Sequence, residues 1–221
     1  MQFFLMHNNI KLMVKNINNQ DTKEILLKAA REEFFEKGYE KASLRNMCNR
    51  AGLTTGALYF FFKDKRDIFN HIIAPLLEEI QTTLVTHFAY EQEMADSAIE
   101  IPDTVDTSDI EVSENILKIM YKYHDECVLF LSTSDVSLNF INRVIQYSEG
   151  HYTTMFEKLS GTSDFDHYIM HWISHLQIDA FVHLFLHEEN EEEALAKIPS
   201  IVSFIVHGFY SYLDEIKKQL E

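Results

Sequence analysis

Apolar residues recur three, four and seven positions apart along most of the chain, the spacing of helices that bury one face. The first such helix is predicted to begin at Asp21, because Asp21 can cap it and Glu24 can reach back, and to end at Gly38. Residues 1–20 are expected to form a flexible arm. No segment shows the strict alternation of a strand, so the pattern predicts an all-α protein.

Two shorter helices are predicted next. One has Ser43 as its N-cap and ends at Gly52, and the other begins at Thr54, whose hydroxyl can cap it, and ends near Phe61. Three short helices with a tight glycine turn between the second and the third form a helix-turn-helix pattern. We therefore expect residues 21–66 to form a small domain.

Residues 67–221 are predicted to form a larger helical domain. Its first helix begins at Lys65, continues toward Met94 and contains Pro75, which removes a backbone donor and is expected to kink it. The acidic stretch 95–113, rich in Asp and Thr, is expected to be a mobile loop.

Further helices are predicted over 113–131, 136–159 and 165–186, and from Asn190 onward. Ser113 is expected to cap the first of them. The helix over 165–186 is apolar on nearly every side, and the last one carries a heptad-like seam that contains Gly208. Such faces indicate burial both within the domain and against a partner chain.

Charge is distributed unevenly between the two predicted domains. The net charge is −16, yet residues 1–70 hold 12 Lys and Arg against 8 Asp and Glu, while residues 71–221 hold 7 against 27. This asymmetry is expected of a small DNA-facing head on an acidic body, which would repel phosphate and restrict binding to one orientation.

Several functional classes lack their sequence signals. No apolar run reaches the roughly 18 residues that a membrane span needs, so we expect a soluble, cytoplasmic protein with no membrane partner. Cys48 and Cys127 form no CxxC pair and are expected to be reduced and buried. There is no HExxH motif, glycine-rich phosphate loop or nucleophile elbow, so we expect no enzyme activity, no cofactor and no metal site.

The segment KASLRNMCNRAGLTTGALYFFFKDKRDIF resembles the signature of the tetracycline-repressor (TetR) family. The matching positions are Gly38-Tyr39, Ser43, Ala51-Gly52, Thr54-Thr55-Gly56, Leu58-Tyr59 and Phe62-Lys63-Asp64-Lys65. The resemblance covers about Thr22 to Ile73. It implies a homodimeric transcriptional regulator, a repressor in most of the family, that leaves a palindromic operator when a small molecule binds the larger domain.

The candidate DNA contacts lie around the second and third helices. A recognition helix must enter a groove about 12 Å wide, so small leading residues and exposed aromatic and basic side chains suit it. The candidates are Lys23, Ser43, Arg45, Thr54, Thr55, Gly56, Ala57, Tyr59, Phe60, Lys63 and Lys65. Taken singly, Thr54 is better explained as a helix cap and Lys63 as a solvated charge; the joint pattern is what indicates DNA binding.

The third helix departs from common base readers. It lacks Arg, Lys, Asn and Gln, the side chains that bind base edges with two hydrogen bonds. The family often has a polar aromatic residue or histidine where this chain has Phe61, which cannot hydrogen-bond phosphate. Readout is therefore expected to depend on methyl contacts, on Arg45 and on DNA shape.

In TetR-like proteins the last two helices form the dimer bundle, and the larger domain holds a small-molecule pocket. Residues that combine aromatic, soft and polar groups at helical spacing are candidate walls for it: Met120, His124, Cys127, Tyr168, Trp172 and His175. Each of them is also explained as an ordinary core residue.

A row of polar residues recurs at every fourth position near the C-terminus. Its members are His167, His171, His175, Asp179, His183 and His187. Each step turns about 40° around the helix, so the row winds by about 200° and cannot converge on one ion. A polar edge beside the apolar face explains it, and a metal- or pH-responsive helical sensor is the alternative function.

Overall fold

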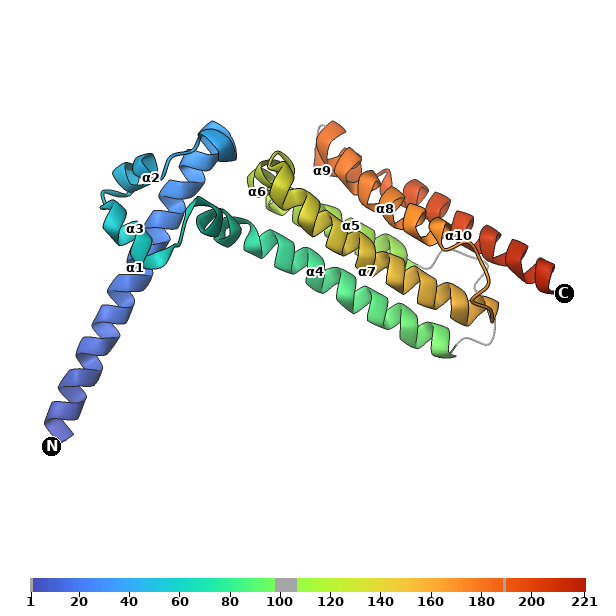
Figure 1. The fold of residues 1–221 in the computed structure, drawn as a ribbon, viewed down its shortest axis with the longest axis horizontal. Helices are drawn as coiled ribbons and strands as arrows, with labels where there is room; N and C mark the ends of the chain where they lie inside the picture. The colour runs from blue at the N-terminus through green and yellow to red at the C-terminus, as the bar shows by residue number, and fades with distance from the viewer. Residues whose placement is uncertain (1, 98–106, 189) are drawn as a thin grey trace. The chain divides into compact units, whose positions relative to one another are not determined.

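The computed structural model describes residues 2–97, 107–188 and 190–221, with only the backbone described for 2–18 and 134–136. All regular secondary structure in these residues is helical (Figure 1), which confirms the predicted all-α class. The helices are α1 Gln2–Lys41, α2 Leu44–Ala51, α3 Thr55–Phe61, α4 Lys65–Ser97, α5 Thr107–Lys122, α6 His124–Leu131, α7 Ser134–Ser160, α8 Tyr168–His187, α9 Glu191–Leu195 and α10 Ile198–Leu220.

The first helix begins much earlier than its capping box predicts. The backbone of α1 is helical from Gln2, so the segment expected as an arm is helical and Asp21 lies inside the helix. No glycine or proline occurs before Gly38, and nothing in the backbone interrupts the helix. Gly38 does so with φ of 72°, a left-handed conformation that side chains disfavour.

The chain divides into two compact units. Unit 1 comprises Met1–Pro75 with Val128–Thr133, and unit 2 comprises Leu76–Cys127 with Ser134–Glu221. The division falls after Pro75, later than residue 66, because the first turns of α4 carry buried residues such as Phe69 and Ile72. In unit 1, the Phe69 ring packs edge-on against Phe34 and Tyr39, with centroids 6.0 and 5.0 Å away.

Unit 2 is built around α7, α8 and α10, joined by α5, α9 and the later part of α4 (Figure 1). Phe156 of α7 is fully buried and meets Phe209 of α10 edge-on, with ring centroids 5.7 Å apart. The same cluster contains Met170, Ile173, Leu213 and Ile216. These residues recur at helical spacing, so the buried faces follow the sequence pattern.

Two predicted segments differ from the structure. Residues 98–106, the centre of the predicted loop, lie outside the described residues, whereas its flanks belong to α4 and α5. Ser113 is therefore no N-cap: it is buried inside α5. The single helix predicted over 113–131 is interrupted at Tyr123 between α5 and α6.

The last predicted helix is divided in two. Asn190 accepts a hydrogen bond from the Glu193 backbone amide at 3.0 Å, as predicted, but caps only the short α9. Pro199 follows at the start of α10, a position where its missing N–H costs nothing and where a continuous helix would lose a bond. The span Glu191–Leu220 is long and apolar enough, by length and composition alone, to cross a membrane. The core helix of a globular protein can meet the same criterion.

Candidate nucleic-acid interface and internal cavity

The turn between α2 and α3 has the geometry that its residues predict. Gly52 takes φ of 66° after α2, and the Leu53 amide donates to the Cys48 carbonyl at 2.9 Å. The Thr54 hydroxyl then accepts from the Ala57 amide at 3.2 Å and caps α3. Leu58 is buried and anchors α3 in unit 1. Thr54 is thus a cap whatever else it contacts.

The outer face of α3 is small at its start and aromatic further on. Thr54, Thr55 and Gly56 are exposed, and Ala57 is half-buried. One turn later Tyr59 and Phe60 are 59% and 70% exposed. Aromatic side chains so exposed on a short helix are unusual in a monomeric surface, and they suit a face that contacts another molecule.

The candidate basic and hydroxyl contacts near α3 are accessible with one exception. Arg45 and Lys63 are exposed. The Ser43 side chain makes no capping bond, so its hydroxyl remains open at the start of α2. The Lys23 ammonium lies 5.6 Å from the centre of the Phe62 ring.

Lys65 is the exception. Its ammonium donates to the carbonyl oxygens of Tyr39, Glu40 and Ala42 at 2.8, 3.1 and 3.4 Å, and lies 4.6 Å from the centre of the Tyr39 ring. An ammonium has three donors, and these carbonyls take them all. A phosphate contact does not fit this geometry, because Lys65 caps the C-terminal end of α1.

A buried carboxylate that the sequence analysis missed joins α1 to α2. Glu33 is 1% exposed and accepts from the Ser43 amide, the Asn46 side-chain amide and Arg50 Nε at 3.3, 2.9 and 3.1 Å. Arg50 also binds Glu36, which lowers the pKa of that carboxyl. The signal was present in the sequence, since Glu33 lies seven residues after Leu26 on the buried face.

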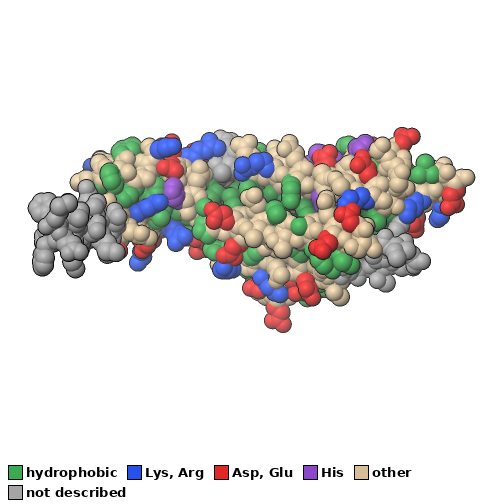
Figure 2. All heavy atoms as spheres, turned by 90° about the horizontal axis from the view of Figure 1, so that it is seen from below, with side chains coloured by type: hydrophobic (Ala, Val, Ile, Leu, Met, Phe, Trp, Pro, Cys, Tyr) green, Lys and Arg blue, Asp and Glu red, His purple; other side chains and the backbone are tan. Residues whose placement is uncertain are grey.

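Basic side chains are frequent over unit 1 and acidic ones over unit 2 on the face drawn in Figure 2. This agrees with the division of charge along the chain. The basic side chains near α3 include Arg45 and Lys63, both exposed. Unit 1 can therefore attract an anion to the end that carries α3.

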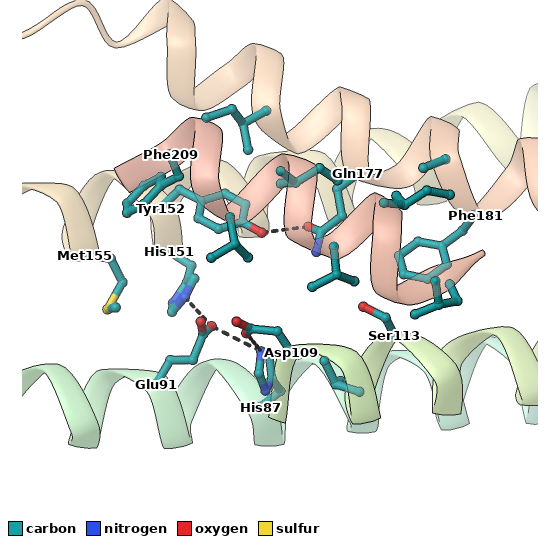
Figure 3. A pocket seen from close by; sticks show the side chains of 18 of the residues that line it. His87, Glu91, Asp109, Ser113, His151, Tyr152, Met155, Gln177, Phe181 and Phe209 are labelled. Carbon is teal, nitrogen blue, oxygen red and sulfur yellow. Dashed lines mark hydrogen bonds and ion pairs between the residues drawn. The ribbon is translucent and has the colours of Figure 1, made fainter. Parts of the chain in front are cut away.

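Unit 2 contains an internal cavity with a free volume of about 70 Å³, lined by residues of α4, α5, α7, α8 and α10. Its walls are mainly apolar, with Ile173, Leu184 and Phe209 among them. The Tyr152 hydroxyl donates to Gln177 Oε1 at 2.9 Å (Figure 3). Burial, then the nearby charges of Glu91 and Asp109, raise the pKa of Tyr152, so it stays a neutral phenol.

Four titratable side chains gather at one end of the cavity, as Figure 3 shows. His87 Nε2 lies 3.4 Å from Glu91 Oε2 and 3.4 Å from Asp109 Oδ1. His151 Nε2 lies 2.8 Å from the same Glu91 oxygen. His87 and Glu91 are four residues apart on α4, Asp109 is in the first turn of α5, and His151 is on α7. The cavity is thus amphipathic.

None of the six predicted pocket residues lines this cavity. Met120 and Cys127 are buried elsewhere, and burial raises the pKa of Cys127 to about 12. His124, Tyr168 and Trp172 are exposed, and His175 is half-buried beside His171. The helical period groups residues by face but does not say which face turns inward: α8 presents Ile173, Gln177 and Phe181 to the cavity instead.

The histidine row forms pairs along α8. His171 Nδ1 lies 2.9 Å from Glu149 Oε2, and the rings of His183 and His187 are 4.4 Å apart. Within the described residues, the group of three His, Cys, Asp or Glu side chains close enough to share an ion is His87, Glu91 and Asp109. It contains no member of the row.

Residues 26–72 match the family described as bacterial regulatory proteins, tetR family. Over 53 residues the chain is 45% identical to the HTH-type transcriptional repressor BepR of Brucella suis, a stretch that covers 24% of this chain and 25% of BepR. The chain therefore spans about a quarter of the length of that curated relative in the match.

Solved structures resemble a much larger part of the chain. A transcriptional regulator from Aquifex aeolicus is 22% identical, with a TM-score of 0.54, over 83% of this chain and 99% of that one. A TetR-family regulator from Syntrophomonas wolfei is 17% identical, with a TM-score of 0.61, over 87% and 96%. At these identities the likeness shows a shared fold. Residues 26–72, which include the helix-turn-helix of α2 and α3, thus match the TetR family of bacterial regulatory proteins, and the rest of the chain shares the fold of such regulators.

Proposed function

We propose that this chain is a homodimeric, sequence-specific DNA-binding transcriptional regulator of the cytoplasm, most simply a repressor, that leaves a palindromic operator when a small molecule binds in unit 2. The observation that carries the proposal is the outer face of α3. Small residues lead it and the exposed Tyr59 and Phe60 follow, on a helix anchored by Leu58. Arg45 and Lys63 supply positive charge nearby, as phosphate binding requires.

A dimer follows from the geometry of operator binding. Two copies of α3 must reach half-sites about 34–36 Å apart, or a multiple of it. α8 and α10 supply a suitable surface, with Tyr168, Trp172, Leu186 and Phe204 exposed. A Cβ at Gly208 would meet nothing within 4 Å in the single chain, so a partner helix can approach closely there.

The cavity in unit 2 supports regulation by a small molecule. Apolar walls with a few convergent polar groups are typical of ligand sites. α4 begins at Lys65 in unit 1 and contributes His87 and Glu91 to the cavity. The same helix therefore belongs to the unit proposed to bind DNA and to the cavity proposed to bind the small molecule. We infer that an occupied cavity favours one position of α4 and thereby changes the distance between the two DNA-binding heads.

The proposal is tested by selecting random duplex DNA on the purified full-length chain. We expect an inverted repeat whose affinity falls steeply with salt. Thr55→Asp introduces a negative charge on the face of α3 and should abolish binding, whereas Thr154→Asp, at a half-buried threonine of unit 2, should leave it unchanged. Failure of a folded dimer to enrich any sequence at low salt would refute the proposal.

The alternative of a sensor built on the histidine row has less support. Its members form pairs along α8, and a third ligand would have to come from outside the row. Metal content that disappears when His183 and His187 are both replaced by alanine would favour that alternative.

A further inference from the structure

We propose that His87, Glu91 and Asp109 form a binding site for a first-row divalent metal ion, with Zn²⁺ as the reference ion, and that a small effector completes its coordination from the cavity. The donor atoms of the three side chains all lie within 4.8 Å of one another. Two of them come from consecutive turns of α4 and the third from the first turn of α5. The effector part of this proposal rests on the proposed function, whereas the metal site does not.

The separations fit ligands of a shared ion better than hydrogen bonds. His87 Nε2 is 3.4 Å from both Glu91 Oε2 and Asp109 Oδ1. Hydrogen bonds between nitrogen and oxygen are mostly about 2.7–3.2 Å long. A tetrahedral ion with bonds of about 2.0–2.1 Å separates its ligands by about 3.3 Å. The three side chains therefore need little movement to accept an ion.

His151 acts as a positioning residue. Its Nε2 lies 2.8 Å from Glu91 Oε2, within hydrogen-bond range, so it can hold this carboxylate toward His87. Its ring stacks on Phe88, with centroids 4.1 Å apart and planes 5° apart, and its side chain is 4% exposed. Such hydrogen bonds to metal ligands fix their orientation and raise metal affinity.

The charge of the cavity points the same way. The side chains of Glu91 and Asp109 are only 22% and 18% exposed, and no Lys or Arg is among the described residues that line the cavity. Two carboxylates taken partly out of water need a cation nearby. A divalent ion supplies it at the centre of the group, and one imidazole with two carboxylates suits Zn²⁺ or Mn²⁺.

Three protein ligands also leave a coordination position unfilled, the arrangement of metal sites that bind a further molecule. All three ligands line the cavity, and so do the polar side chains of Tyr152 and Gln177. The effector class that fits is a small molecule with an oxygen donor for the ion and an apolar body for walls such as Ile173 and Phe209. Such a molecule would bind much more weakly to the metal-free chain.

The test is a titration of the metal-free full-length chain with Zn²⁺ by calorimetry, together with the visible spectrum of the Co²⁺ form. We expect one equivalent of Zn²⁺ per chain and the intense Co²⁺ bands of a four-coordinate site. Asp109→Asn and His87→Gln preserve side-chain size and should weaken binding at least about 100-fold, and His151→Gln about 10- to 100-fold. The matched control His183→Ala, on the exposed face of α8, should bind as the unaltered chain does.

The absence of stoichiometric binding to the unaltered chain would overturn the inference. Binding that survives Asp109→Asn and His87→Gln, or that His183→Ala removes, would equally overturn it by assigning the metal to another site. Because none of these measurements involves DNA, they separate the metal site from the operator: a Zn²⁺ site in a chain that selects no DNA would refute only the proposed function.

Discussion

The ammonium of Lys65 lies 2.8 Å from the carbonyl oxygen of Tyr39 and 4.6 Å from the centre of its ring, so the first residue of α4 closes the end of α1. Its neighbour Lys63 is exposed, two residues earlier. The two lysines are alike in sequence and both look like phosphate ligands. The structure gives them different tasks, and this difference can be measured.

We expect Lys65→Met to destabilise unit 1 by about 2 kcal/mol, because hydrogen bonds from a charged group to the carbonyl oxygens at the end of α1 contribute about that much. Lys63→Met should change the free energy of unfolding by less than about 0.5 kcal/mol. It should also reduce the slope of log operator affinity against log salt concentration by about 1, the share of one phosphate contact. Urea denaturation and salt titrations on both variants measure this. Equal loss of stability in the two variants would contradict the assignment.

Glu33 is predicted to be the most sensitive polar residue of unit 1. Glu33→Ala leaves the Ser43 amide, Asn46 and Arg50 without a buried acceptor, and we expect a loss of about 3 kcal/mol. The control is Glu32→Ala. The Glu32 side chain is half exposed and lies 3.9 Å from Arg50, so its ion pair is weak, and we expect a change below about 0.5 kcal/mol. Chemical denaturation curves of the two variants decide the matter.

Operator recognition should depend on thymine methyl groups. α3 carries no Arg, Lys, Asn or Gln, while Tyr59 and Phe60 are exposed on it. Replacing a contacted thymine by uracil removes one methyl group and should cost about 0.8 kcal/mol, close to a fourfold loss of affinity. The measurement is a scan of single uracil substitutions through the selected operator. Uniform affinity across the scan would argue for shape and Arg45 as the readers instead.

The dimer should depend on Phe204, which is 70% exposed on α10. Phe204→Glu places a charge in the expected contact between copies and should give a monomer in analytical ultracentrifugation. Leu138→Glu is the control: it replaces an apolar residue of α7 that is 56% exposed, and the variant should remain dimeric. A monomeric unaltered chain would contradict the proposed dimer. A dimer that Leu138→Glu disrupts would assign the contact to another face.

The two thiols should be unreactive in the folded chain. Burial raises the pKa of Cys127 to about 12 and that of Cys48 above its usual value, so the reactive thiolate is scarce at pH 8. We expect a disulfide reagent to modify neither cysteine until the chain is unfolded, and both thereafter. Rapid modification of native protein at either position would show that the surrounding helices open.

The helix-turn-helix was predictable because it is specified locally. Gly52 accepts a left-handed conformation, Thr54 caps the helix that follows it, and Leu58 marks the buried side. Each of these signals acts within four residues, and the structure reproduces them. The reduced, buried state of Cys48 and Cys127 was predicted on equally general grounds and is confirmed.

The extent of α1 and the cavity of unit 2 were not predictable in the same way. A capping pattern at Asp21 permits a helix to begin there but cannot stop one that arrives from upstream. The cavity brings together His87, Asp109 and His151 from three helices, which no local spacing relates. The histidine row was conspicuous in the sequence, but its period spreads it around α8.

The sequence by itself determined the helical class, the helix-turn-helix and the match of residues 26–72 to the TetR family, since these depend on neighbouring residues and on the period of one helix. Only the tertiary structure decided which charges are available and which are used inside the protein. Lys65 and Glu33 are bound to backbone and side-chain partners up to 26 residues away, and His87, Glu91, Asp109 and His151 share one cavity. The physical reason is that packing, rather than periodicity, selects the partner of a polar group once water is excluded.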